Sequence, residues 1–158
     1  LSVLRALLAE RVPIRNIVLI VEAVAEAKTR SLDLTASVEL VRQRLSFQII
    51  DRLKDDEGRL SLVQLSTRWE TIFAENEITR DNGVPDIALP PGLFGELINA
   101  IQTKLNECAE KGVMACVAIS SNRRRFLQTV LSSKGVRNSV VAYEEIGPRA
   151  NPRIVGVV

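Results

Sequence analysis

Residues 112–146 read GVMACVAISSNRRRFLQTVLSSKGVRNSVVAYEEI, and this stretch decides the fold. Residues 113–119 form a continuous apolar run, which is typical of a strand buried on both faces of a parallel sheet. A serine or asparagine at 120–122 can cap the helix that follows, and Gly135 ends that helix. A second apolar run at 139–143 is predicted as the next strand. Strand, helix and strand in this order predict a βαβ unit.

Further strands and helices are predicted before and after this unit. A turn-rich stretch at 79–92 contains Asn82-Gly83 and three prolines, so it is predicted as a loop. Trp69 is predicted to lie in the core, on a helix that begins after Ser66 or Thr67. The other expected elements are a strand at 60–65, a long helix at about 93–111 and a last short strand at 154–158.

Residues 1–54 follow the three-four spacing of amphipathic helices, and three helices joined by short turns are expected there. Pro13 suits the first turn of the second helix. The acidic turn at 55–58 is the expected boundary between a helical part, 1–56, and an α/β part, 57–158. The fold class is therefore α+β. The residues predicted to be buried in the helical part are Ile17, Val21, Val24, Val41, Leu45 and Ile49.

Composition argues against most enzyme classes. The chain has 158 residues, 46% of them hydrophobic, but no histidine and only two cysteines. A Ser-His-Asp triad, a His-ligated zinc and a Cys₄ zinc site are excluded within the chain. We expect no catalytic residue, metal or cofactor. Cys108 and Cys116 lie among apolar residues and are predicted to be buried thiols, with a redox pair as the alternative. No apolar run is long enough to span a membrane.

The net charge is only +2, but the charges are unevenly distributed. Residues 57–111 carry five basic and nine acidic side chains, whereas residues 112–158 carry seven basic and two acidic side chains. A chain polarised in this way can attract a charged partner. Arginines at 42, 44 and 52 leave a nucleic-acid-binding module as one alternative, although we expect no nucleic acid as a partner.

The sharpest local feature is the cluster Arg123-Arg124-Arg125, which follows a predicted strand and opens a helix. Free N–H groups at a helix start attract anions, whereas three cations there oppose the helix dipole. The chain lacks the glycine patterns of nucleotide-binding loops. Three interpretations stay open: solvated arginines that pair with Glu144 and Glu145, a partner-binding basic patch, and an anion or nucleotide site centred on 120–125.

Paired carboxylates are weak candidates for chemistry. Glu144 and Glu145 are predicted to point to opposite faces of a strand, so they cannot converge on one substrate. The run Asp55-Asp56-Glu57 lacks the ligand spacing of a calcium loop, and a solvated turn is expected there.

Several segments resemble one known family. Residues 4–16, LRALLAERVPIRN, resemble its leucine-rich helix followed by V-x-I-R-[DN]. Residues 20–26, IVEAVAE, are similar to its I-L-E-A-L-A-E phrase. The endings at 143–146, YEEI, and 154–158, IVGVV, resemble its S-Y-x-E-I and V-G-x-V motifs. On these residues the chain is identified as a member of the FHIPEP family, the large export-gate subunit of type III secretion systems, with the flagellar branch favoured over the injectisome branch.

The resemblance implies a piece of the cytoplasmic half of an inner-membrane protein. Residues 1–56 would belong to its third, helical subdomain and 57–158 would be its fourth, α/β subdomain. The membrane-spanning half would lie outside this sequence. In the family, the cytoplasmic halves assemble into a nine-membered ring, and the implied partners are export chaperones, substrates and other export components. Residues 63–70 and 117–127 depart from the family phrases, so the family's interactions at those two turns do not carry over to this chain. The candidate partner-binding residues are Arg123, Arg124 and Arg125, from the basic helix start.

Overall fold

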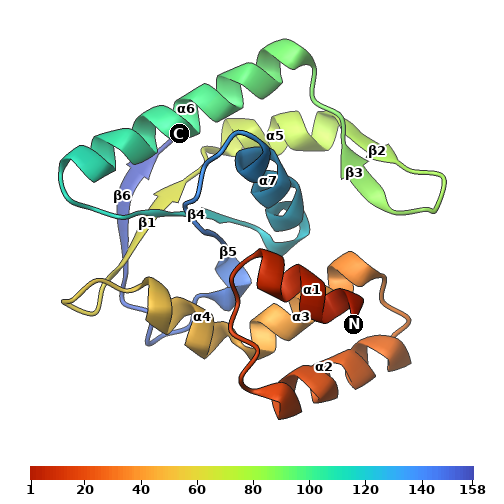
Figure 1. Ribbon diagram of the computed structural model, residues 1–158. Helices are drawn as coiled ribbons and strands as arrows, with labels where there is room; N and C mark the ends of the chain where they lie inside the picture. Colours follow the sequence, from red (N-terminus) through yellow and green to blue (C-terminus); the bar gives the residue numbers. More distant parts are fainter.

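A parallel four-stranded sheet lies at the centre of the computed structural model, which describes residues 1–158 (Figure 1). The strands lie in the order β5-β4-β1-β6, and each neighbouring pair is parallel. β1 is Leu60–Gln64, β4 is Cys116–Ile119, β5 is Val140–Ala142 and β6 is Pro152–Val157. Helix α7, Ser121–Ser133, connects β4 to β5, so the predicted βαβ unit is confirmed.

Both faces of β4, in the middle of the sheet, are buried, as its continuous apolar run predicts. Val117 and Ile119 point to the face covered by α5 (Thr67–Glu75), α6 (Pro91–Glu110) and α7, where Trp69 is buried. Cys116 and Ala118 point to the other face and pack against Ile50 of α4 (Ser46–Leu53).

The two cysteines lie on different faces of the sheet, and both are free thiols. Cys108 on α6 is 6% exposed and Cys116 is 3% exposed, which confirms their predicted burial. Burial raises the pKa of the Cys116 thiol to about 11, because the charged thiolate is poorly solvated there.

The helical part contains four helices where three were predicted: α1 (Ser2–Ala9), α2 (Ile17–Thr29), α3 (Leu34–Arg44) and α4. Helix α2 begins after Asn16, whose side chain accepts a hydrogen bond from the Leu19 N–H, and not at Pro13. The predicted third helix breaks at Leu45, a fully buried residue that ends α3 and precedes α4. Within α4, Ile49 faces the helical core and Ile50 faces the sheet.

The predicted register of α2 is wrong. Ile17 and Val21 are 48% and 59% exposed, and Val24 is half-buried. The buried side of α2 is instead formed by Ile20, Ala23 and Ala27. Because residues 17–21 are apolar on every side, their spacing does not identify the buried face. Helix α2 packs against α3 through its small alanines. Val41, Leu45 and Ile49 are buried as predicted.

Two further segments differ from the prediction. The expected loop at 79–92 contains part of an antiparallel hairpin of β2 (Glu77–Thr79) and β3 (Pro85–Ile87), with a turn at Asn82-Gly83. Gly83 has a φ of 76°, a conformation that glycine adopts without strain. Residues Tyr143–Glu145 form a single 3₁₀ turn, η1, where the chain was expected to continue a strand.

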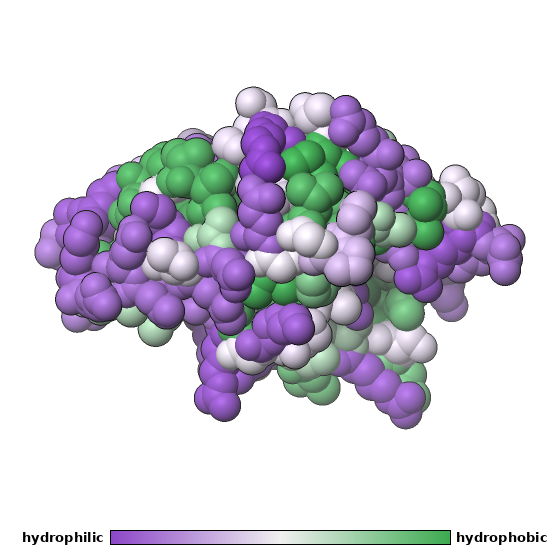
Figure 2. Space-filling view, turned by 90° about the horizontal axis from the view of Figure 1, so that it is seen from above, coloured by the Kyte–Doolittle hydropathy of each residue, from purple (hydrophilic) through white to green (hydrophobic).

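The surface seen from the side of α6 carries separate hydrophobic patches divided by hydrophilic side chains (Figure 2). No helix combines the length and the apolar character that crossing a bilayer requires.

The division at residues 56 and 57 stays a prediction, and "helical part" and "α/β part" denote 1–56 and 57–158 below. Helix α4 contributes side chains to the cores of both parts.

Candidate functional site

The arginine cluster lies in the first turn of α7, directly after β4, where the α/β part meets the helical part. Arg124 is fully buried, and Arg123 is 8% exposed. Only Arg125 keeps a substantially exposed side chain, at 41%. The interpretation as three solvated arginines is therefore wrong. A partner-binding role for Arg123, Arg124 and Arg125 stays a prediction, and Arg125 alone offers much surface to a partner.

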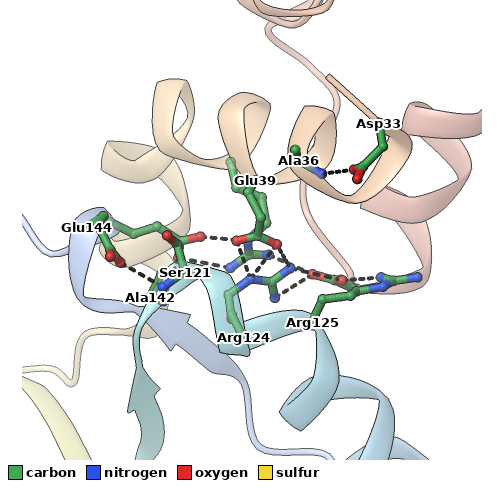
Figure 3. A network of polar contacts seen from close by, with 11 residues as sticks. Asp33, Ala36, Glu39, Ser121, Arg124, Arg125, Ala142 and Glu144 are labelled. Atoms are coloured by element: carbon green, nitrogen blue, oxygen red, sulfur yellow. Dashed lines mark hydrogen bonds and ion pairs between the residues drawn. The ribbon is translucent and has the colours of Figure 1, made fainter. Parts of the chain in front are cut away.

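Arg124 binds two carboxylates of the helical part (Figure 3). Its Nε donates to both oxygens of Glu39 at 2.9 Å, and one terminal nitrogen donates to Glu39 Oε1 at 2.5 Å. Its terminal nitrogens also donate to Glu10 at 2.9 and 3.2 Å. The buried charge is therefore bound on two sides by opposite charges, as a buried guanidinium requires.

Glu10, which follows α1, is shared by three arginines. Besides Arg124, it accepts a hydrogen bond from Arg42 at 2.9 Å and one from Arg125 at 2.6 Å. Arg42 in turn makes a two-pronged contact with Glu145 of η1, at 2.7 and 3.0 Å. We call this set the junction network; it holds three cations and three carboxylates, namely Arg42, Arg124, Arg125, Glu10, Glu39 and Glu145.

The start of α7 already holds an anion supplied by the chain. Glu144 accepts a hydrogen bond from the Ser121 N–H at 3.0 Å (Figure 3). Beside it, Arg123 donates to Glu77 of the hairpin at 2.7 Å, while its buried Nε has no hydrogen-bond partner. Glu144 therefore bonds the helix start and not an arginine, whereas Glu145 pairs with Arg42. The predicted pairing of the cluster with Glu144 and Glu145 is wrong.

The environment shifts the pKa values of Glu10 and Glu39 in opposite directions. Burial raises the pKa of Glu10, but Arg124, Arg42 and Arg125 together outweigh it and leave that pKa below the usual 4.5. For Glu39, burial is the larger effect and raises the pKa above 4.5 despite Arg124. The two carboxylates of Arg124 hold its pKa above the usual value although burial alone would lower it.

This arrangement supports a structural joint between the two parts. Each network member pairs with at least one opposite charge inside the network, and no group of three or more His, Cys, Asp or Glu side chains is placed to hold a metal ion. Removing one partner of a buried ion pair costs about 3–5 kcal/mol because the other charge is left unpaired. The network therefore ties the helical part firmly to the α/β part.

Sequence reasoning missed the carboxylate half of this site. Glu39 lies 85 positions from Arg124, and Glu10 lies 114 positions from it, so no local spacing connects them. Arg42, considered above for nucleic-acid binding, is 3% exposed and has its charge satisfied internally. One usable signal was Glu39 itself, because it stands between the apolar residues Val38 and Leu40 in the sequence.

Comparison with known proteins gives consistent results. The family model described as "FHIPEP family" matches residues 1–151. The chain is 33% identical over 156 residues to the flagellar biosynthesis protein FlhA of Caulobacter vibrioides, covering 99% of this chain and 22% of that protein. It thus spans about a fifth of this curated relative.

Two solved structures are similar over almost the whole chain. The Shigella flexneri MxiA protein is 26% identical with a TM-score of 0.84, covering 99% of this chain and 50% of that one. The cryo-EM structure of nonameric EPEC SctV-C is 19% identical with a TM-score of 0.86, covering 99% and 46% respectively, and shows a shared fold.

Proposed function

Because the chain belongs to the FHIPEP family, we propose that it is a docking and ring-building part of a type III protein export gate, in the flagellar branch. It would act at the cytoplasmic face of the bacterial inner membrane, and its implied partners are export chaperones, their substrates and other export components. The flagellar assignment is supported by the similarity to a flagellar biosynthesis protein. The proposal is one of binding and assembly, without catalysis.

The exposed apolar face of α2 carries the assembly half of this proposal. Ile17, Val18 and Val21 are 48%, 62% and 59% exposed, although all three are aliphatic. Adjacent exposed apolar side chains on one helix are typical of a surface that a protein partner covers. A similar fold occurs in a nonameric assembly, which supports self-association as the reason for this face.

The junction network supports the same proposal in another way. A ring closes only if each copy presents its contact surfaces at a constant angle. A buried network between the two parts fixes that angle, because opening it would leave charges unpaired. The network therefore suits a chain that acts as a rigid unit of an assembly.

The alternative of an anion- or nucleotide-binding regulatory domain at 120–125 is disfavoured by the site. Glu144 occupies the helix start, and Arg124 is saturated by Glu10 and Glu39. A nucleotide titration of the chain, followed by thermal melting, should therefore leave the melting temperature unchanged.

The proposal is tested in the bacterium, on the full-length protein. Val21→Asp places a charge on the exposed face of α2, and Thr71→Asp places the same charge on an exposed position of α5 as a matched control. We expect both variants to accumulate normally, and only Val21→Asp to reduce secretion and ring formation, measured by export assays and cross-linking. Normal secretion and normal cross-linking of Val21→Asp would refute self-association through this face.

A further inference from the structure

A second charged region lies at the opposite edge of the sheet from the junction network. All four strands are parallel, so their first residues meet at one edge. A groove of about 690 Å³ runs there, between the end of α4 and the turns that precede β1, β4 and β5. We call it the strand-start groove. Its basic lining residues are Arg52, Lys54, Arg59, Lys111, Arg137 and Arg153.

The charges of this groove are only partly satisfied by the chain. Its lining carries six basic and three acidic side chains, a net charge of +3. Arg59 is paired with Asp55 and Glu57. The other five cations have no carboxylate partner within salt-bridge distance, although Lys54 donates to the Arg149 carbonyl at 2.8 Å. In contrast, every cation of the junction network is paired.

The unpaired cations come from separate elements that the fold brings together. Arg52 lies on α4, Lys111 ends α6, Arg137 precedes β5 and Arg153 lies on β6. Four like charges gathered around one hollow repel one another, and an incoming anion relieves that repulsion. The groove is thus an electrostatic site for a negatively charged partner.

The rest of the lining identifies the kind of anion. Met114 is 76% exposed at the groove, and a flexible methionine adapts to varied apolar side chains. The acidic turn with Asp56 forms part of the wall, so the groove suits a partner whose negative charges are spaced apart better than the continuous charge of a nucleic acid. A flat anionic bilayer cannot follow a concave surface. Separate carboxylates spaced by apolar residues fit both the cations and Met114.

We propose that the strand-start groove binds an acidic, extended peptide segment of a partner protein. The partner's carboxylates would contact Arg137, Arg153, Lys111 and Arg52, and an apolar side chain between them would contact Met114. The site is independent of the α2 face and of ring formation, so each proposal can fail without the other.

The probe is a fluorescein-labelled peptide of alternating glutamate and leucine, titrated with the 158-residue chain and followed by fluorescence anisotropy. We expect saturable binding that weakens when salt rises from about 0.1 M to about 1 M, since the screening length falls from about 10 Å to about 3 Å. The same peptide with glutamine for glutamate should not bind. Equal binding of the glutamine peptide would overturn the proposal.

Matched variants locate the site. Arg137→Glu with Arg153→Glu should weaken peptide binding by at least about tenfold, because each reversal removes an attraction and adds a repulsion. Arg5→Glu with Arg15→Glu makes the same charge change at exposed positions outside the groove and should leave binding unchanged. Thermal melting checks that both variants are folded.

Two further titrations exclude the other polyanions. A single-stranded RNA and vesicles that contain phosphatidylglycerol are added to the same chain at about 0.1 M salt. We expect that neither binds through the groove. Any binding of the RNA or the vesicles should therefore be unchanged in the double variant Arg137→Glu, Arg153→Glu. Groove-dependent binding of RNA or vesicles without binding of the acidic peptide would overturn the proposal, as would equal loss of peptide binding in both pairs of variants.

Discussion

Arg124 holds a full positive charge with no exposed surface, and its environment explains why this is stable. Two carboxylates bind it, and both come from the helical part of the chain. Desolvating a guanidinium is costly, so the pair adds less net stability than its short distances suggest. The larger effect is the penalty for breaking it. The residue therefore fixes the position of α7 against α1 and α3.

Replacing Arg124 by alanine should lower the free energy of unfolding by about 3–5 kcal/mol, because Glu39 and Glu10 lose their main buried partner. Arg125→Ala removes a neighbouring arginine that also contacts Glu10 but is 41% exposed, and it should cost about 1 kcal/mol or less. Urea denaturation measures both values. Equal losses in the two variants would contradict the junction network as described.

The network also predicts how stability depends on pH. The lowered pKa of Glu10 gives stability that is complete above pH 4.5 and is lost as the pH falls through the lowered value. The raised pKa of Glu39 acts in the opposite sense. Between 4.5 and that raised value, the native state holds a proton that the unfolded chain has released, so acidification favours folding there.

Glu10→Gln should therefore make the acid-side loss of unfolding free energy shallower than in the wild type, and Glu39→Gln should make it steeper. The two variants differ from the wild type by one charge each, so they serve as controls for one another. Urea titrations from about pH 7 down to about pH 3 provide the measurement. Parallel pH profiles in all three proteins would show that neither carboxyl is shifted.

At this scale the sequence could predict the importance of the arginines but not their role. Three cations at a helix start conflict with the helix dipole, and that conflict correctly marked an unusual site. Its resolution depends on Glu10, Glu39 and Glu77, which lie far away along the chain. Only the tertiary fold brings them to α7.

Among the elements, α2 shows that hydrophobic periodicity can predict a helix without predicting which of its faces is buried. Its apolar residues surround the helix at its N-terminal end, so two registers satisfy the same pattern. The structure buries the side that carries Ala23 and Ala27. Small residues let two helices approach closely, and a rule based on hydrophobicity alone underestimates them.

Two neighbouring substitutions test this register. Ile20→Asp should destabilise the helical part by several kcal/mol, because it buries an unpaired carboxylate at a position that is 2% exposed. Val21→Asp should change the unfolding free energy by only about 0.5 kcal/mol, because position 21 is 59% exposed. Thermal melting compares them, and a reversed order would show that the helix is rotated.

The strands were easier to predict than the hairpin. The four residues of β4 are all buried, and a continuous apolar run reports this directly. The strands β2 and β3 have three residues each, and most of those residues are exposed or half-buried, so their hydropathy gives no signal. The Asn82-Gly83 turn was visible, and it is the one feature that could have indicated a hairpin.

For the whole molecule, the apolar area that α2 exposes is small compared with a stable interface. Three aliphatic side chains on α2 are far from the roughly 1,200–2,000 Å² that specific complexes bury. If the full-length protein is anchored in the membrane, as proposed, tethering would raise the effective concentration of neighbouring copies. We therefore expect the 158-residue chain by itself to be monomeric or weakly associated at micromolar concentration.

Light scattering coupled to size-exclusion chromatography measures this state, with an expected mass near 17.5 kDa. Val21→Asp serves as the comparison, because it removes part of the apolar face without touching the core. A stable closed oligomer of the wild-type chain would contradict the expectation.

The burial of both cysteines has a practical consequence for spectroscopy. The thiolate is the form of cysteine that attacks a maleimide, and a thiol with a pKa of about 11 is almost entirely protonated at neutral pH. The Cys116 side chain is further shielded in the core on one face of the sheet, and Cys108 is shielded in the core on the other face. A dye or spin label directed to a new surface cysteine should thus attach there selectively in the native protein. Distances between α2 and the strand-start groove could then be followed without first removing the natural cysteines.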